Sequence, residues 1–411
     1  MRVPKIRKRW AIVGASAAIL AVCAWIHLWF ALGVIIVAGA AFVAKRYRIE
    51  LRGGKAVASQ SASLLQSVAH AITPRAAADP TDTKGLVEEL LAQGRYALLL
   101  RKQIVSNLSD EQFERAREAL SESMALVPEG EVALGPIDQA LEDGKLDNEE
   151  LALHEGKIVR VSALFLDRYP VTNLQFKEFV DGGGYEQMSI WDPHIWPAVL
   201  DFVDQTGAHG PRMWKHGRCE KGHEQHPVVG VSWYEAAAYA RWVGKRLPTD
   251  AEWVKAGSWP VPLSPTSRMQ RKYPWGDSMD RGRCNLWGSG PGRVVAVTDY
   301  AQGVSVGGIR QLIGNVWEWT STNFGAGALH GGDFSLPSPM KSLRGGAFDT
   351  YFENQASCHF QSGEKPVARK HNVGFRCAVS MCDLVLAQVS VTDAVGPAAE
   401  QLEHDKQEVA A

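Results

Sequence analysis

Cysteine is scarce in this 411-residue chain, which has six of them, and so few exclude a small scaffold held together by disulfides. An excess of either charge is also missing, because 44 basic side chains stand against 45 acidic ones. Proteins that bind nucleic acid usually carry a basic face, so we expect no nucleic-acid partner. No repeat or heptad pattern runs through the sequence, which argues against a solenoid or a long coiled coil. With 45% apolar and 22% charged residues, the composition is that of an ordinary folded protein.

One long apolar segment stands near the N-terminus. Residues 10–44 contain no charged side chain, and as one helix they would extend roughly 52 Å, against a hydrocarbon core of about 30 Å. A single span over residues 10–30 fits, and so does a hairpin of two spans, each slightly shorter than usual. We favour the hairpin, because basic clusters flank both ends and aromatic residues lie midway. This pattern predicts an integral membrane protein of the inner or plasma membrane, with its globular domain in the cytoplasm.

The composition and periodicity change several times after this segment. Residues 83–121 have apolar positions at helical spacing, and Ser109 starts a capping box with the Gln three residues later. Beyond them, short alternating strands and turns predominate. We therefore divide the chain into a membrane anchor with basic flanks (1–52), a linker (53–82), a short helical stalk (83–121), a globular domain (122–380) and a polar tail (381–411).

The globular region predicts short strands and a few capped helices. Residues 124–135 are typical of a strand, a turn and a second strand, and residues 157–167 of another alternating strand. Thr172 and Ser232 stand where N-caps are favoured, ahead of helical patterns, and Thr249 opens a capping box with the Glu three residues later. Together these elements predict an α+β fold class.

Seven motifs follow one another in the globular region, and together they carry a resemblance to a known family. They are Tyr169-Pro-Val-Thr-Asn173, His226-Pro-Val-Val-Gly-Val-Ser-Trp233, Gly244-Lys-Arg-Leu-Pro-Thr-Asp-Ala-Glu-Trp253, Tyr273-Pro-Trp-Gly-Asp277, Gly314-Asn-Val-Trp-Glu-Trp-Thr320, Leu343-Arg-Gly-Gly346 and Asn372-Val-Gly-Phe-Arg-Cys-Ala378. Their order and spacing resemble the formylglycine-generating enzyme family, also called the sulfatase-modifying factor domain family. The resemblance implies a variant of the C-type lectin fold, with two helices and small antiparallel sheets.

The resemblance also implies calcium as a cofactor. One family site combines side-chain and carbonyl oxygens, a donor set that suits Ca²⁺. The residues that match its ligands are Gln311 and Glu318, through their side chains, and Gly314 and Val316, through their carbonyls. Alternatively, Glu318 is a buried residue that accepts hydrogen bonds from nearby backbone N–H groups. A second family site would begin at Asn285 and Leu286, but the loop that would complete it, residues 287–294, is short here.

The paired thiols of the family are missing. In formylglycine-generating enzymes, two cysteines a few residues after the Arg-Gly-Gly motif bind copper, and soft sulfur ligands favour Cu(I). The matching positions here are Thr350 and Gln355, so we expect neither copper nor formylglycine formation. The residues around these positions form a candidate pocket of mixed aromatic and acidic character, which consists of Asp349, Tyr351, Phe352, Glu353 and Cys358.

A second metal site is suggested by spacing alone. Histidine and cysteine recur within one Gly-rich stretch at intervals like those of metal ligands, namely at His209, His216, Cys219, His223 and His226. Without a second Cys pair the signal is weak, and a solvated polar loop explains the same residues.

Two functions remain open from the sequence. The favoured one is a membrane-anchored binding or maturation factor that acts on an unknown protein or peptide partner. The alternative is a metal-dependent oxidoreductase, formylglycine-generating or of a related non-haem type, with an altered site. The family's sulfoxide synthases take iron from a helical bundle with three His, whereas residues 83–126 contain no His. Fold resemblance by itself does not decide between the two functions.

Overall fold

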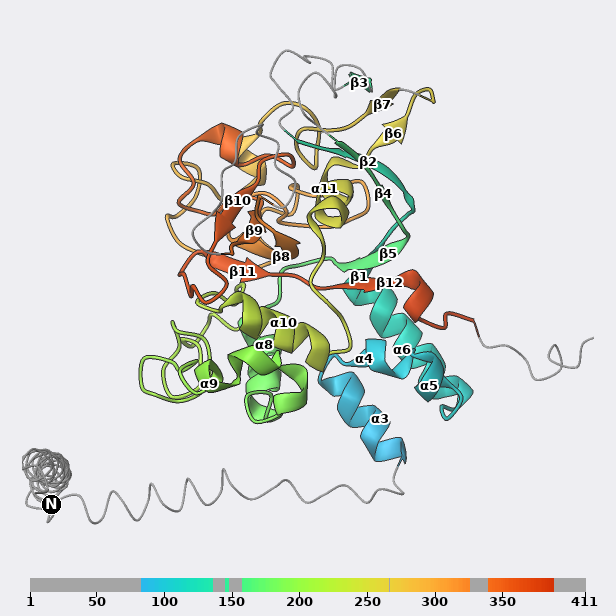
Figure 1. Cartoon of the computed structure of the whole chain (residues 1–411), viewed down its shortest axis with the longest axis vertical. Helices are drawn as coiled ribbons and strands as arrows, with labels where there is room; N and C mark the ends of the chain where they lie inside the picture. Colours follow the sequence, from blue (N-terminus) through green and yellow to red (C-terminus); the bar gives the residue numbers. More distant parts are fainter. Residues whose placement is uncertain (1–82, 136–144, 148–156, 266, 326–338, 388–411) are drawn as a thin grey trace, which may run out of the picture. The chain divides into compact units, whose positions relative to one another are not determined.

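Short helices and strands joined by long loops make up the described part of the chain (Figure 1). The computed structural model describes residues 83–135, 145–147, 157–265, 267–325 and 339–387. No helix within these ranges is long and apolar enough to cross a bilayer. The predicted membrane anchor and linker lie outside the described residues. The mixture of helices and strands confirms the predicted α+β fold class.

The region from residue 83 to residue 123 is helical, as predicted. It contains α3 (Thr83–Ala92), α4 (Tyr96–Leu99), α5 (Lys102–Val105) and α6 (Asp110–Ser123). The Ser109 hydroxyl accepts from the backbone N–H of Gln112, and the Gln112 side chain accepts from the backbone N–H of Ser109. This reciprocal pair is the predicted capping box, and it starts α6 where the sequence placed it.

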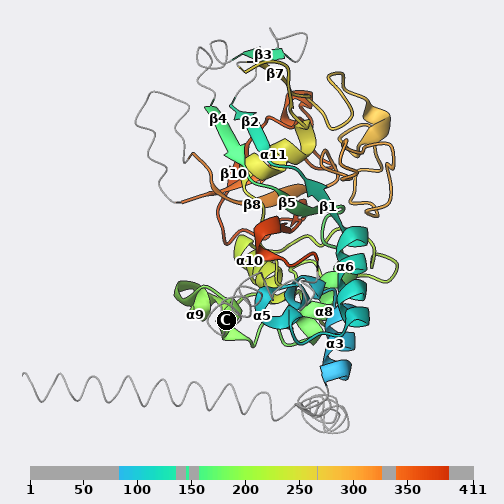
Figure 2. The same cartoon turned by 90° about the vertical axis from the view of Figure 1, so that its right-hand side faces the viewer.

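These helices do not form a separate stalk, and that prediction was wrong. Phe113 and Leu120 of α6 lie in one apolar cluster with Val379 and Leu384 from the far end of the globular domain. The N–H of Val385 donates to the carbonyl of Leu100 at 2.8 Å. The helices bury their apolar faces against the domain rather than standing away from it, and Figure 2 shows them together along one side. The compact unit therefore begins at Thr83, and its packed core continues past residue 380.

Two cations reinforce this attachment at the end of α10 (Trp233–Trp242). Arg95 lies over the Trp242 ring, 4.6 Å from its centroid, and its Nε donates to the Trp242 carbonyl at 2.9 Å. Lys245 Nζ lies 2.7 Å from Asp167 and 2.7 Å from the hydroxyl of Tyr96 in α4. Arg95 thus lies at the carbonyl-rich C-terminus of α10, where a cation is stabilising. Lys245 links α4 to Asp167 of β5 (Leu164–Asp167).

Within the described ranges, the strands form four small sheets. In spatial order they are β1 (Met124–Val127), β5 (Leu164–Asp167) and β12 (Ala378–Ser380); β10 (Ser362–Glu364), β9 (Lys341–Arg344), β8 (Trp317–Asn323) and β11 (Val373–Phe375); β2 (Gly130–Leu134) and β4 (Lys157–Val161); and β3 (Lys145–Asp147), β7 (Ser267–Met269) and β6 (Val261–Pro262). In these sheets the pair of β11 and β8 is parallel and the other pairs are antiparallel.

The predicted strands at residues 124–135 are present but do not pair with each other. β1 pairs with β5, and β2 pairs with β4. The predicted strand at 157–167 is correspondingly two strands, β4 and β5, which belong to different sheets. Residues 124–135 and residues 157–167 therefore pair with each other twice, once in each of two sheets. Period-two alternation predicts that a strand exists but does not name its partner.

The three helices expected in the globular domain begin at their predicted caps. They are α8 (Asn173–Asp181) after Thr172, α10 after Ser232 and α11 (Asp250–Ser258) after Thr249, each with a complete capping box. α8 and α10 pack around an aromatic core in which Phe176, Phe179, Tyr239 and Phe375 make ring-to-ring contacts. The remaining short helices are η1 (Met188–Ile190), η2 (Pro193–Ile195), α9 (Trp196–Val199), η3 (Arg281–Arg283), η4 (Glu353–Gln355) and η5 (Met381–Asp383).

Candidate functional site

Glu318 and Arg376 form a buried ion pair where a calcium ligand was expected. Both side chains are fully buried. Arg376 Nη2 donates to Glu318 Oε1 at 2.6 Å, and Arg376 Nε and Trp253 Nε1 each donate to Oε2 at 2.7 Å. The carboxylate is therefore committed to side-chain donors rather than to a metal ion or to nearby backbone N–H groups. The assignment of Glu318 as a calcium ligand is corrected accordingly.

Two other residues of that predicted calcium site, Gln311 and Gly314, are also engaged. Gln311 donates to two backbone carbonyls at 2.8 and 3.0 Å, and its Oε1 accepts from Asn315 Nδ2 at 2.8 Å. The Gly314 carbonyl accepts from the N–H of Val316 at 2.9 Å. These bonds fold residues 311–316 into a tight loop, in which Gln311, Gly314 and Asn315 have positive φ angles. The donor set does not fit calcium, because its one carboxylate is already neutralised.

The second predicted calcium site has a single uncommitted oxygen. Asn285 is buried, and its Nδ2 donates to the Arg293 carbonyl at 2.9 Å and to Asn315 Oδ1 at 3.0 Å. Its Oδ1 is buried without a hydrogen-bond partner. The Leu286 carbonyl accepts from Ser289 and Gly290. Calcium takes six to eight oxygens, and one free amide oxygen falls far short of such a site.

The histidine-rich loop does not form a metal centre either. His209 stacks on Tyr185 with 5.1 Å between the ring centroids, and His223 and His226 pack edge to face at 4.5 Å. Across the described ranges, no group of three or more His, Cys, Asp or Glu side chains is placed to hold a metal ion. The spacing of these residues therefore reflects ring packing and a polar loop, the simpler of the two interpretations.

The two positions that carry thiols in the family hold non-redox side chains here. Thr350 is nearly buried, and its hydroxyl accepts from the N–H of Ala347 at 2.8 Å. Gln355 closes the short helix η4 and is partly exposed. Cys358 is fully buried, and burial raises the pKa of its thiol well above the usual range. Because a buried, protonated thiol is unreactive, Cys358 is removed from the candidate pocket.

Three exposed aromatic residues gather beside these positions, and we call them the aromatic face: Trp287, Tyr351 and Phe352. Their exposed fractions are 55%, 66% and 61%. The rings of Tyr351 and Phe352 meet edge to face at 5.2 Å, and those of Trp287 and Tyr351 lie 6.5 Å apart. The backbone N–H of Trp287 donates to the Thr350 carbonyl at 3.3 Å. Sequence reasoning identified Tyr351 and Phe352 but missed Trp287, which lies far away in the chain.

The acidic residues of the candidate pocket flank this face and are paired. Glu353 lies 3.7 Å from Arg281. Asp349 accepts two hydrogen bonds of 3.0 Å from Asn372 Nδ2 and lies 3.5 Å from His371. The predicted residues other than Cys358 are thus brought to one surface. Its acidic side chains each have a partner, so the exposed aromatic rings are its distinguishing feature.

These observations define a mixed α+β domain with small sheets, helices that begin at capping boxes, and exposed aromatic rings beside the positions that would hold a thiol pair. The chain belongs to the sulfatase-modifying factor enzyme 1-like domain family, whose model matches residues 109–381. The resemblance stated from the motifs is thereby confirmed at the level of the family. The match also begins at the cap of α6, which agrees with the packing of that helix on the domain.

Several relatives show how widely the domain is used. The chain is 30% identical over 307 residues to the formylglycine-generating enzyme of Streptomyces coelicolor, covering 64% of this chain and 91% of that protein. It is 35% identical over 213 residues to the hercynine oxygenase of Mycolicibacterium smegmatis, covering 50% of this chain and 47% of that protein. It is 31% identical over 306 residues to the serine/threonine-protein kinase Pkn1 of Chlamydia trachomatis, covering 71% of this chain and 44% of that protein. The chain therefore spans about half the length of the hercynine oxygenase.

Solved structures give a fainter likeness. PvdO from Pseudomonas aeruginosa superposes with a TM-score of 0.41 at 18% identity, covering 63% of this chain and 94% of that chain.

Proposed function

We propose that this chain is a maturation factor that binds a polypeptide at the aromatic face without forming formylglycine. The observation that carries the proposal is that one surface lacks the paired thiols and exposes aromatic rings. Thr350 and Gln355 replace the paired thiols, while Trp287, Tyr351 and Phe352 remain exposed beside them. The proposal therefore assigns binding, and not thiol chemistry, to this surface.

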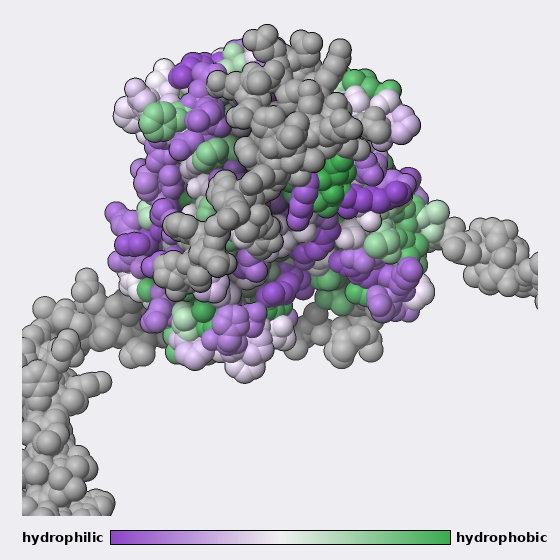
Figure 3. Space-filling model, turned by 45° about the horizontal axis from the view of Figure 1, so that its top comes forward, coloured by the Kyte–Doolittle hydropathy of each residue, from purple (hydrophilic) through white to green (hydrophobic). Residues whose placement is uncertain are grey.

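Exposed aromatic rings are well suited to holding an extended chain. Trp and Tyr dominate the energetics of binding surfaces, because each buries a large area and loses little side-chain entropy. On the face of the molecule shown in Figure 3, hydrophobic residues form small groups among hydrophilic ones. Single exposed apolar residues are ordinary in soluble domains. Three neighbouring aromatic rings, with Tyr351 next to both of the others, make a larger apolar surface and support a binding role.

The N-terminal apolar segment completes the proposal. An anchor in residues 10–44 with basic flanks would hold the domain at a membrane, with the hairpin topology keeping it in the cytoplasm. The client would then be a polypeptide that meets the domain at the membrane surface.

Related enzyme chemistry is the competing proposal. Relatives named formylglycine-generating enzyme and hercynine oxygenase support it. Without a thiol pair, such an enzyme would need a donor set other than the one implied by the family. The two proposals differ in one observable, because an enzyme changes the mass of its substrate and a binding factor does not.

A peptide array probed with the full-length chain tests the proposal. Peptides that bind are then titrated against the wild type, the Tyr351→Ala/Phe352→Ala double variant and the control Val306→Ala, which removes an exposed apolar side chain outside the face. We expect the double variant to lose affinity about tenfold or more and the control to match the wild type. Equal binding by all three proteins would refute the aromatic face, and a mass change in the bound peptide would favour the enzyme.

A further inference from the structure

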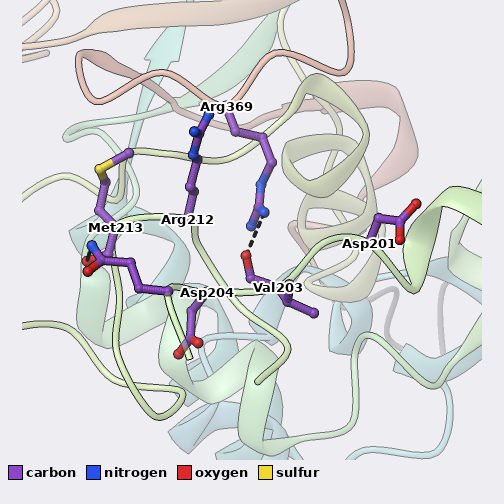
Figure 4. Close-up of a pocket in the computed structure, with 7 residues that line it drawn as sticks. Asp201, Val203, Asp204, Arg212, Met213 and Arg369 are labelled. Carbon is purple, nitrogen blue, oxygen red and sulfur yellow. Dashed lines mark hydrogen bonds between the residues drawn. The ribbon is translucent and has the colours of Figure 1, made fainter. Parts of the chain in front are cut away.

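A pocket separate from the aromatic face opens between the loop that follows α9 and the loop that precedes β11. Its volume is about 430 Å³, within the range of small-molecule sites. Figure 4 shows the side chains that line it, namely Asp201, Val203, Asp204, Gln205, Arg212, Met213 and Arg369. Arg212 and Arg369 both line it, although residues 212 and 369 are far apart in the chain.

Arg369 is a fixed part of the pocket wall. Its Nη1 donates to the Val203 carbonyl at 2.7 Å, and its Nη2 donates to Glu235 Oε1 at 2.9 Å. Glu235 is fully buried and also accepts from the Tyr185 hydroxyl at 2.7 Å. The charge of Arg369 is therefore neutralised by the buried Glu235 carboxylate. Its guanidinium also holds the 201–210 loop in place.

The carboxylate of Asp204 is likewise used within the protein. It accepts from the N–H and the hydroxyl of Thr206 at 2.7 Å and from the N–H of Gly217 at 2.7 Å. Burial acts to raise the pKa of Asp204, but these hydrogen bonds outweigh it and lower the pKa. Asp204 thus shapes the loop as a charged acceptor, and in Figure 4 its carboxylate and that of Asp201 point away from the two guanidinium groups.

Arg212 differs from Arg369, because no residue in the described ranges binds its guanidinium. The backbone N–H of Arg212 is bonded to the Gly230 carbonyl at 2.9 Å, which anchors its main chain. The side chain is exposed, and it forms no hydrogen bond or ion pair with any residue in the described ranges. A guanidinium fork presents parallel N–H donors that match the two oxygens of a carboxylate.

We propose that this pocket binds a small monocarboxylate, held by the Arg212 guanidinium and packed against Val203 and Met213. The single uncommitted cation matches one negative charge. A dianion such as phosphate is disfavoured, because the Arg212 guanidinium neutralises one charge and leaves the second one in a pocket that Asp201 and Asp204 also line. The two side chains of Val203 and Met213 provide an apolar wall for the hydrocarbon part of the ligand. This site is independent of the proposed aromatic face.

The test uses the purified full-length chain in a buffer free of carboxylates. Acetate, butyrate, benzoate and inorganic phosphate are titrated by ligand-observed NMR up to about 10 mM, which corresponds to weak but measurable affinity. We expect saturable binding of a carboxylate, a preference for those with an apolar body, and no comparable binding of phosphate. Absence of carboxylate binding overturns the site, and phosphate binding of equal strength overturns the monocarboxylate assignment.

Variants then locate the binding. Arg212→Gln should weaken it at least about tenfold, because a charge-assisted bidentate contact is lost, while the melting temperature stays unchanged. Arg218→Gln is the matched control, since Arg218 is an exposed arginine of the same loop region that does not line the pocket. An equal loss in both variants would show unspecific attraction and refute the proposal. The Tyr351→Ala/Phe352→Ala variant should bind the carboxylate normally, so this site and the aromatic face can fail separately.

Discussion

Replacing Glu318 by Gln should destabilise the domain strongly, with or without calcium. Glu318 Oε2 accepts from both Arg376 Nε and Trp253 Nε1, and Oε1 accepts from Arg376 Nη2. A glutamine has one acceptor oxygen and one amide group that only donates. In either orientation its NH₂ faces an N–H donor, and the Arg376 charge is left buried without its partner.

The expected size of the effect follows from burial. Removing one partner of a buried ion pair costs about 3–5 kcal/mol, and Glu318 and Arg376 are both fully buried. For a domain of this order of size, each kcal/mol moves the melting temperature by about 2–4 °C. We therefore expect Glu318→Gln to lower it by about 10 °C.

Replacing Arg376 by Met removes the other partner of the same ion pair. Arg376 also donates to the carbonyls of Asp167 at 3.0 Å and Arg310 at 2.9 Å. Its removal leaves these groups unsatisfied in addition to the Glu318 carboxylate, so Arg376→Met should destabilise the domain at least as much. Glu88→Gln serves as the control, because it removes the partner of Arg115 in an ion pair that is exposed to solvent. That variant should melt like the wild type.

Thermal unfolding of the full-length proteins, followed by circular dichroism with calcium and with chelator, checks these expectations. A ligand bound only by the folded state would raise stability by RT ln(1 + [L]/Kd). With Glu318 committed to Arg376, calcium should leave the wild-type melting temperature unchanged. If calcium stabilises the wild type and Glu318→Gln abolishes the gain, the carboxylate is a ligand and the ion-pair argument is wrong.

Three further predictions concern chemistry, pH and topology. With Thr350 and Gln355 in place of thiols, the chain incubated with copper, oxygen and a Cys-x-Pro-x-Arg peptide should yield no aldehyde by mass spectrometry, and detection of one would contradict the assignment. Burial lowers the pKa of His359 to about 3, whereas the unfolded value is about 6.5. Below pH 6.5 the unfolded state therefore binds a proton that the folded state does not. As the pH is lowered further, the free energy of unfolding decreases by about 1.4 kcal/mol per pH unit. Urea unfolding should show a loss of about 2 kcal/mol between pH 7 and 5 from this group, and His359→Gln should lack that share. Equal pH dependence in both proteins would exclude His359 as the cause. Finally, a reporter active only outside the cytoplasm, fused after residue 60, should be silent, because basic clusters flank both ends of residues 10–44. Strong activity would favour the single span.

Helix starts could be predicted from the sequence because their causes are local. Ser109, Thr172, Ser232 and Thr249 each bond to a residue three positions ahead, so the signal and its effect lie within one turn. The order of the motifs likewise identified the family, and the residues at 350 and 355 showed directly that the thiols are missing.

Partners that are distant in the chain were decided by the tertiary structure alone. The strands within 124–135 have the right pattern, but their pairing with β5 and β4 depends on how the chain crosses between two sheets. The apolar stripe of α6 predicted burial without showing that Val379 and Leu384 would cover it.

The candidate sites show the same division. From the sequence, Glu318 was interpreted as a metal ligand, with a buried acceptor as the alternative. Arg376, which directly follows β11, makes it half of an ion pair. Trp287 joined Tyr351 only through folding, and Arg212 met Arg369 in a pocket that no motif marked. Residue type and short-range spacing determine which contacts a side chain is able to make. Packing of distant segments determines which of them it makes, because a buried charge must be neutralised by whatever the fold brings beside it.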